Sequence, residues 1–165
     1  MKQIGVPPGA FNFRLVLIVI LVTIFMLVFL SYANGISIAI EKTSIQQTKN
    51  IINSTLAVVF ANYTVKGEQE RLNELNGSNP FEHLEKYGAV PATYQGEIDA
   101  DNLKDSEPGW YYDGHNGLAL YKTFYDDRVY YFTIVLDFRD IDGSGRFEPE
   151  IDEFQHLSFR QIPQQ

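Results

Sequence analysis

The residues with the clearest chemical potential lie in one short acidic segment near the C-terminus. It reads Asp-Ile-Asp-Gly-Ser-Gly-Arg-Phe-Glu from Asp140 to Glu148. Aligned with an EF-hand loop, its oxygen ligands fall at loop positions 1, 3, 5, 7 and 9, and position 7 contributes its backbone carbonyl. In that order the residues are Asp140, Asp142, Ser144, Arg146 and Glu148. With Gly145 at the sharp turn, this spacing predicts a weak calcium site.

A tight acidic turn explains the same residues without a metal. Asp-Gly and Ser-Gly pairs are common in turns, because glycine tolerates unusual backbone angles and Asp binds nearby backbone N–H groups. The segment also departs from an EF-hand, since Ile151 stands where a bidentate glutamate belongs and a strand is expected before the loop. A missing carboxylate would have to come from the flanks, from Asp137, Glu150, Asp152 or Glu153. A calcium loop and a plain turn are both open interpretations.

Elsewhere the chain offers little that catalysis requires. The three histidines, His83, His115 and His156, are far apart in the sequence and lack metal-ligand spacing. The sequence contains no nucleophile elbow, P-loop or dinucleotide-binding pattern, and it has no cysteine for thiol chemistry or disulfides. These features predict a protein that is not an enzyme and that has no cofactor other than the calcium considered above.

An antiparallel sheet is expected to position the acidic segment. Alternating apolar residues, aromatic residues and turn residues predict four strands joined by short connections. We expect them near Trp110–Tyr112, Leu118–Phe124, Val129–Phe138 and Gln155–Ile162. The many aromatic side chains of this region are expected to fill the sheet core, with a ligand-binding platform as the alternative.

A long helix is expected before this sheet, because residues 9–79 contain no proline. Apolar residues at helical spacing predict one stripe on an amphipathic helix that ends near Leu75. The stripe consists of Ile38, Ile45, Ile52, Leu56 and Val59. We expect it to be buried against the sheet of the same chain or against a partner helix. Two separate helices, broken at Asn34-Gly35, are the alternative.

The N-terminal part of this helix has the composition of a membrane span. Residues 15–30 contain a single polar residue, and no charge lies between Arg14 and Glu41. About 20 apolar residues cross a bilayer, so residues 15–33 predict a transmembrane helix that contacts membrane lipid. A cleaved signal peptide is the main alternative, because Ser31-Tyr32-Ala33 resembles a cleavage site.

The charges divide and orient the chain. Residues 1–40 contain only two charges, Lys2 and Arg14, whereas the remainder holds all 21 acidic and 11 basic residues, a formal charge of −10. Arg14 beside the apolar core favours a cytoplasmic N-terminus. Such an acidic body repels phosphate backbones, which excludes nucleic acid as a partner. The predicted regions are a cytoplasmic N-terminus at 1–14, a transmembrane helix at 15–33, an amphipathic helix at 34–75 and a translocated sheet domain at 76–165.

This plan of a long, half-membrane helix, a loop and a four-stranded antiparallel sheet resembles the type IV pilins and pseudopilins. Two stretches also resemble accessory proteins of MSHA (mannose-sensitive haemagglutinin) pilus biogenesis. They are Asn79–Phe81 leading to Pro91–Gly96, and Pro108–Asp113 with Leu120-Tyr121 beyond. The resemblance implies a pilin-like α+β fold, an inner-membrane protein with a periplasmic domain, and a role in pilus assembly through contacts with other pilus subunits.

One position departs from the pilin pattern. A pilin leader ends in glycine and is followed by a glutamate at the fifth mature position, but the fifth residue after Gly9 is Arg14. This charge reversal predicts that residues 1–9 are retained and that the protein is an assembly component instead of a major filament subunit. The alternative function is a tethered extracytoplasmic binding or sensor module.

Overall fold

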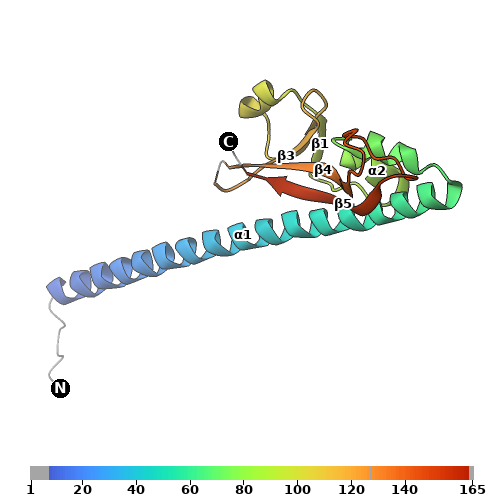
Figure 1. The fold of residues 1–165 in the computed structure, drawn as a ribbon. Coiled ribbons are helices and arrows are strands. Elements are labelled where there is room, and N and C mark those ends of the chain that lie inside the picture. The colour runs from blue at the N-terminus through green and yellow to red at the C-terminus, as the bar shows by residue number, and fades with distance from the viewer. Residues whose placement is uncertain (1–7, 127, 164–165) are drawn as a thin grey trace, which may run out of the picture. The chain divides into compact units, whose positions relative to one another are not determined.

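The computed structural model describes residues 8–126 and 128–163. These residues form two compact units, Met1–Ile40 and Glu41–Gln165. The elements are one long helix, three short helical segments and five strands (Figure 1). Half of the predicted cytoplasmic N-terminus, residues 1–7, lies outside the described residues.

The long helix, α1 (Pro8–Lys66), contains both the predicted membrane segment and the predicted apolar stripe. It continues through Gly35, which contradicts the alternative of two helices broken at that point. In the first unit its large apolar side chains, Phe13 and those from Leu15 to Leu30, are all more than half exposed. By length and composition this helix could cross a membrane. A helix that is apolar on every face is stable in lipid, because its backbone hydrogen bonds are made internally.

The expected helix end near Leu75 is wrong, because α1 ends at Lys66. Gly67 adopts a left-handed conformation with φ of 69°, which closes the helix. The N–H of Glu68 then donates to the carbonyl of Tyr63 at 2.9 Å, as in a Schellman motif. A 3₁₀ segment, η1 (Gln69–Leu75), follows this stop.

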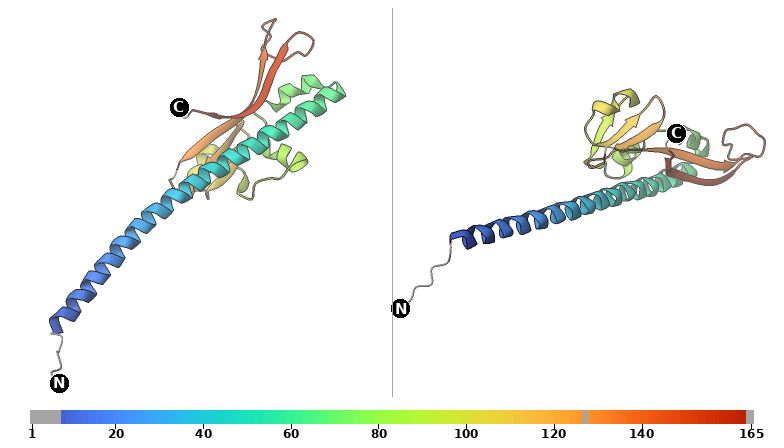
Figure 2. Two further views of the ribbon diagram at one scale, coloured as in Figure 1. Left: turned by 90° about the horizontal axis from the view of Figure 1, so that it is seen from below. Right: turned by 90° about the vertical axis from the view of Figure 1, so that its left-hand side faces the viewer.

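The second unit contains a five-stranded sheet in the order β1-β2-β3-β4-β5. Its last four strands form the expected antiparallel meander, and the α+β class is confirmed. These strands are β2 (Gly109–Asp113), β3 (Leu118–Lys122), β4 (Val129–Arg139) and β5 (Glu153–Ile162). Figure 2 shows that β4 and β5 form the longest ribbon of the sheet, with their connecting loop at its end.

A fifth strand, β1 (Tyr94–Glu97), corrects the predicted purely antiparallel, four-stranded sheet, because it pairs with β2 in parallel. Beside this pairing, the N–H of Trp110 donates to the carbonyl of Thr93 at 2.8 Å. The strand is short and contains Gly96 with φ of 104°, so it lacks the alternating apolar pattern of a longer strand. A parallel pair requires a crossover connection between its strands. Here the chain crosses back from β1 to β2 through a helical segment, η2 (Ala100–Asp105).

The main core lies between the sheet and residues 41–66 of α1. Trp110 occupies its centre and is 1% exposed; its ring lies 5.1 Å from Phe132 between centroids. A short helix, α2 (Pro80–Tyr87), and η1 contribute further buried side chains. The aromatic residues of the strands therefore fill a core, as expected, and do not form a ligand platform.

Candidate functional site

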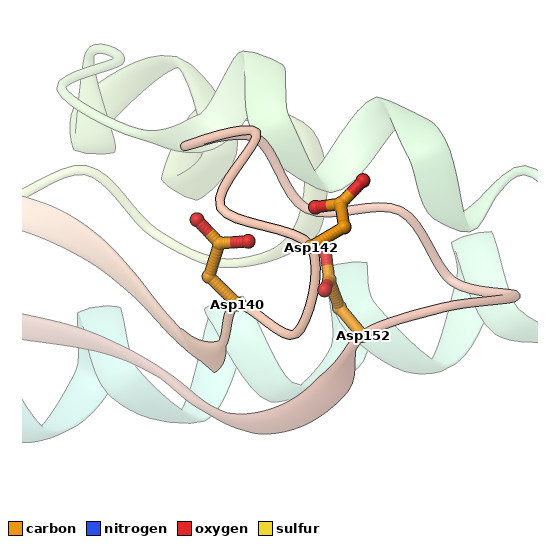
Figure 3. Close-up of side chains that lie close together, drawn as sticks. All are labelled: Asp140, Asp142 and Asp152. Atoms are coloured by element: carbon orange, nitrogen blue, oxygen red, sulfur yellow. The ribbon is translucent and has the colours of Figure 1, made fainter.

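The loop between β4 and β5 contains a cluster of potential cation ligands. Asp140, Asp142 and Asp152 each place one carboxylate oxygen within 4.8 Å of the others (Figure 3). We call these three residues the acidic triad. Asp140 and Asp142 are exposed, whereas Asp152 is only 8% exposed. Carboxylate oxygens are the ligands that calcium prefers.

The triad agrees only in part with the predicted calcium ligands. Two of the five predicted residues belong to it, and its third carboxylate is the flanking Asp152 instead of Glu148. Asp152 reaches this place because its N–H donates to the carbonyl of Glu148 at 2.7 Å and closes a turn. The hydroxyl of Ser144 donates to the carbonyl of Arg146 at 3.0 Å, so these two predicted ligands contact each other.

Backbone N–H groups already bind the carboxylates of the triad. Asp140 accepts from Gly145 at 2.8 Å and from Gly143 at 2.7 Å. These bonds, above all the one from Gly145, lower the pKa of Asp140. Both glycines have positive φ, 77° at Gly143 and 72° at Gly145. Further N–H donors to the triad are Ile141, Ser144 and Glu148. The loop is thus a hydrogen-bonded turn whose carboxylates retain lone pairs that could coordinate a cation.

Two asparagine side chains fasten helical segments to distant backbone. Asn73 of η1 accepts from the N–H of Phe147 at 2.9 Å and donates to the carbonyl of the same residue at 2.8 Å. Asn53 of α1 binds Phe159 of the outer strand β5 in the same way, accepting from its N–H at 2.7 Å. Neither pairing is apparent from the sequence, because more than 70 residues separate the partners.

The connection between β3 and β4 is held by Glu41, the first residue of the second unit. One carboxylate oxygen of Glu41 accepts from the N–H of Phe124 at 2.7 Å and from the hydroxyl of Tyr121 at 3.0 Å. Burial and the adjacent carboxylate raise the pKa of Tyr121, so its hydroxyl keeps the proton that it donates. Sequence reasoning missed this site; its one signal is that Glu41 ends a long uncharged run.

The predicted apolar stripe of α1 is taken up by the sheet of the same chain. Ile52, Leu56 and Val59 are at most 2% exposed and belong to the main core. Ile45 is half-buried against that core, whereas Ile38 belongs to the first unit. From residue 45 onward the stripe is therefore not free to bind a partner helix.

A second face of α1 within the second unit is uncharged and open to solvent. Ile51, Val58 and Val65 recur at seven-residue intervals and are 43%, 49% and 87% exposed. The small residues Ser54 and Ala61 lie between them and are also exposed. We call these five residues the outer stripe. Ile51, Val58 and Val65 thus present apolar surface to solvent along one face of the helix.

Among the described residues, none of the three histidines belongs to the acidic triad. His83 lies with its Nε2 3.1 Å from the hydroxyl of Ser78, and burial lowers the pKa of His83. The Ser78 hydroxyl also donates to the carbonyl of Leu75 at 2.9 Å, which closes the end of η1. His156 contacts Asp137 at 2.8 Å across β4 and β5. All of these contacts join neighbouring structural elements.

Comparison of the chain with protein-family models, with curated proteins and with solved structures finds no match.

Proposed function

We propose that this chain is a single-pass, membrane-anchored, pilin-like component of MSHA-type pilus biogenesis that acts through protein–protein contacts. In this proposal the N-terminus lies in the cytoplasm, α1 crosses the inner membrane and the sheet domain lies in the periplasm. The capacity of α1 to span a membrane supports it, as do the α+β plan and the resemblance of residues 79–96 and 108–121 to accessory proteins of such pili.

The outer stripe is the observation that carries the proposal. The second unit has a formal charge of −10, yet the stripe contains no charged residue. Side chains such as Ile51 and Val58 can insert into a partner, while Ser54 and Ala61 allow its backbone to approach closely. A shallow groove of about 340 Å³, walled by Tyr87 of α2, runs beside the first three of these residues.

The spacing of the outer stripe favours a helix as the partner. Its residues, at positions 51, 54, 58, 61 and 65, are alternately three and four apart, which is the pattern of a seam between two helices packed side by side. A partner helix that left the same bilayer would run parallel to α1. Membrane-anchored pilus assembly subunits with a long helix would meet this requirement.

Two adjacent isoleucines provide the experiment. Ile51 is 43% exposed on the outer stripe, and Ile52 is 1% exposed in the core. We expect the full-length Ile51→Asp protein to fold and remain in the membrane. Its co-purification with pilus assembly subunits, and the number of surface pili, should fall by at least about tenfold, since losing ~1.4 kcal/mol of binding weakens association tenfold.

Ile52→Asp is the matched comparison. A buried aspartate without a partner should destabilise the second unit by more than about 3 kcal/mol, and the protein should not accumulate. Normal piliation and normal co-purification in the Ile51→Asp strain would contradict the proposed function. That result would favour a tethered extracytoplasmic module that is not part of a filament machine.

A further inference from the structure

Two aromatic rings stand exposed in the connection between β3 and β4. Phe124 is 51% exposed and Tyr125 is 58% exposed, with ring centroids 6.4 Å apart. Among the aromatic residues that the structure describes in the second unit, they are the two that are exposed. Exposed adjacent aromatic rings are costly in water, so they indicate a surface that is covered by something apolar.

The position of these rings is fixed by α1. The backbone N–H of Phe124 donates directly to the carboxylate of Glu41 at 2.7 Å. The hydroxyl of Tyr121, on the preceding strand β3, donates to the same oxygen, and Glu41 is only 7% exposed. Phe124 therefore lies within roughly one side-chain length of the α1 backbone at residue 41.

The length of α1 determines where residue 41 lies relative to a bilayer. No charged residue occurs between Arg14 and Glu41, and both belong to the same helix. At 1.5 Å per residue, the helix between these two charges is about 40 Å long. A bilayer with its headgroup layers is about 40–45 Å thick. If α1 spans the membrane as proposed above, with Arg14 among the headgroups of one leaflet, Glu41 lies among those of the other.

We infer that Phe124 and Tyr125 form an aromatic anchor that inserts into the headgroup layer beside the membrane end of α1. Rings of this kind favour the membrane–water interface, where the apolar body is shielded and the tyrosine hydroxyl stays hydrated. The neighbouring Asp126 does not oppose this placement, because its carboxylate pairs with Arg128 at 3.2 Å. The occupant of the exposed surface is therefore lipid, and the sheet domain is held to the bilayer at a second point besides α1.

The lack of native cysteine makes a depth measurement direct. Full-length Tyr125→Cys and Ile141→Cys proteins would each carry one fluorophore and be reconstituted into phosphatidylcholine vesicles. Ile141 is the matched control, because it is 62% exposed, similar to Tyr125, but follows the far end of β4. Brominated lipid quenches fluorophores within the bilayer, whereas iodide quenches those in water. Phe124→Cys provides a second, independent position in the anchor.

We expect brominated lipid to quench positions 124 and 125 at least about twofold more than position 141, with the reverse order for iodide, as for groups buried at the headgroup boundary. Equal quenching at the three positions would overturn the anchor. Extraction of the vesicles with alkaline carbonate separates the two proposals. Release of the protein would overturn the membrane span and the anchor together. If the protein is retained but the fluorophores at positions 124 and 125 are quenched by iodide, the anchor alone is overturned, and a protein partner is indicated.

Discussion

The two connections at the ends of β4 are fixed by similar contacts but present opposite surfaces. At its start, the connection from β3 carries the exposed rings of Phe124 and Tyr125. At its end, the loop to β5 carries the acidic triad. The strand of 11 residues separates them by about 35 Å. In each case one polar side chain from the N-terminal helical region binds distant backbone: Glu41 at the first, Asn73 at the second.

The chemistry of each contact matches what it binds. Glu41 accepts only, and it meets two donors, the N–H of Phe124 and the hydroxyl of Tyr121. Asn73 offers both a donor and an acceptor, and it meets the carbonyl and the N–H of Phe147. A buried polar group needs such a partner whatever the surface beyond it displays. In this domain, therefore, the contact that holds a loop in place does not determine the chemistry of the residues that the loop exposes.

Among changes at these two connections, the largest effect is expected from Glu41→Ala. This change leaves the buried hydroxyl of Tyr121 and the part-buried N–H of Phe124 without an acceptor, which should destabilise the second unit by about 2–3 kcal/mol. Chemical denaturation of the full chain in detergent micelles, followed by the fluorescence of Trp110, would measure the loss. Glu41→Gln keeps one acceptor oxygen and should cost less than half as much. Equal losses in the two variants would show that charge, not hydrogen bonding, holds the aromatic connection.

A smaller effect is expected from Asn73→Ala, about 1–2 kcal/mol, because two neutral hydrogen bonds to the backbone of Phe147 are lost. Hydrogen exchange should increase at the N–H of Phe147 and in the acidic loop, but not in the connection between β3 and β4. Asn73→Asp retains the acceptor for that N–H and should show an intermediate loss. Uniform exchange across both connections would mean that the two are not held independently.

The smallest effect is expected from calcium. Since backbone N–H groups already bind the triad, removal of calcium by a chelator should leave the thermal midpoint of the full chain unchanged. A bound ion would behave differently. At ten times its dissociation constant it would add about 1.4 kcal/mol of stability, an increase that Asp142→Asn should reduce. Such an increase at ~10 mM calcium, well above the range of weak extracellular sites, would establish the triad as a cation site instead of a turn.

Much of the fold was predictable because its signals are local. Alternation and turn residues predict β2 to β5 within a few residues, and uniform apolarity from Leu15 to Leu30 predicts a helix able to span a membrane. The strand β1 was not predictable, because its four residues include a glycine and only one apolar residue, Tyr94. The end of α1 at Lys66 depends on the single glycine that follows it. At the acidic loop, the sequence indicates Asp140, Asp142 and Glu148 as carboxylate ligands, and it offers Asp152 only as one of four flanking candidates for a further carboxylate.

The sequence by itself determined which segments are apolar, where the charges lie and which turns can form, since these depend on residues that are neighbours along the chain. Only the tertiary structure decided that Asp152 completes the triad and that Glu41 and Asn73 hold connections more than 70 residues away. It also decided which α1 face is buried and which remains as the outer stripe, so that Ile52 is enclosed and Ile51 is not. The physical reason is that hydrogen bonding and burial between distant segments require a fixed geometry, which composition and spacing along the chain do not specify.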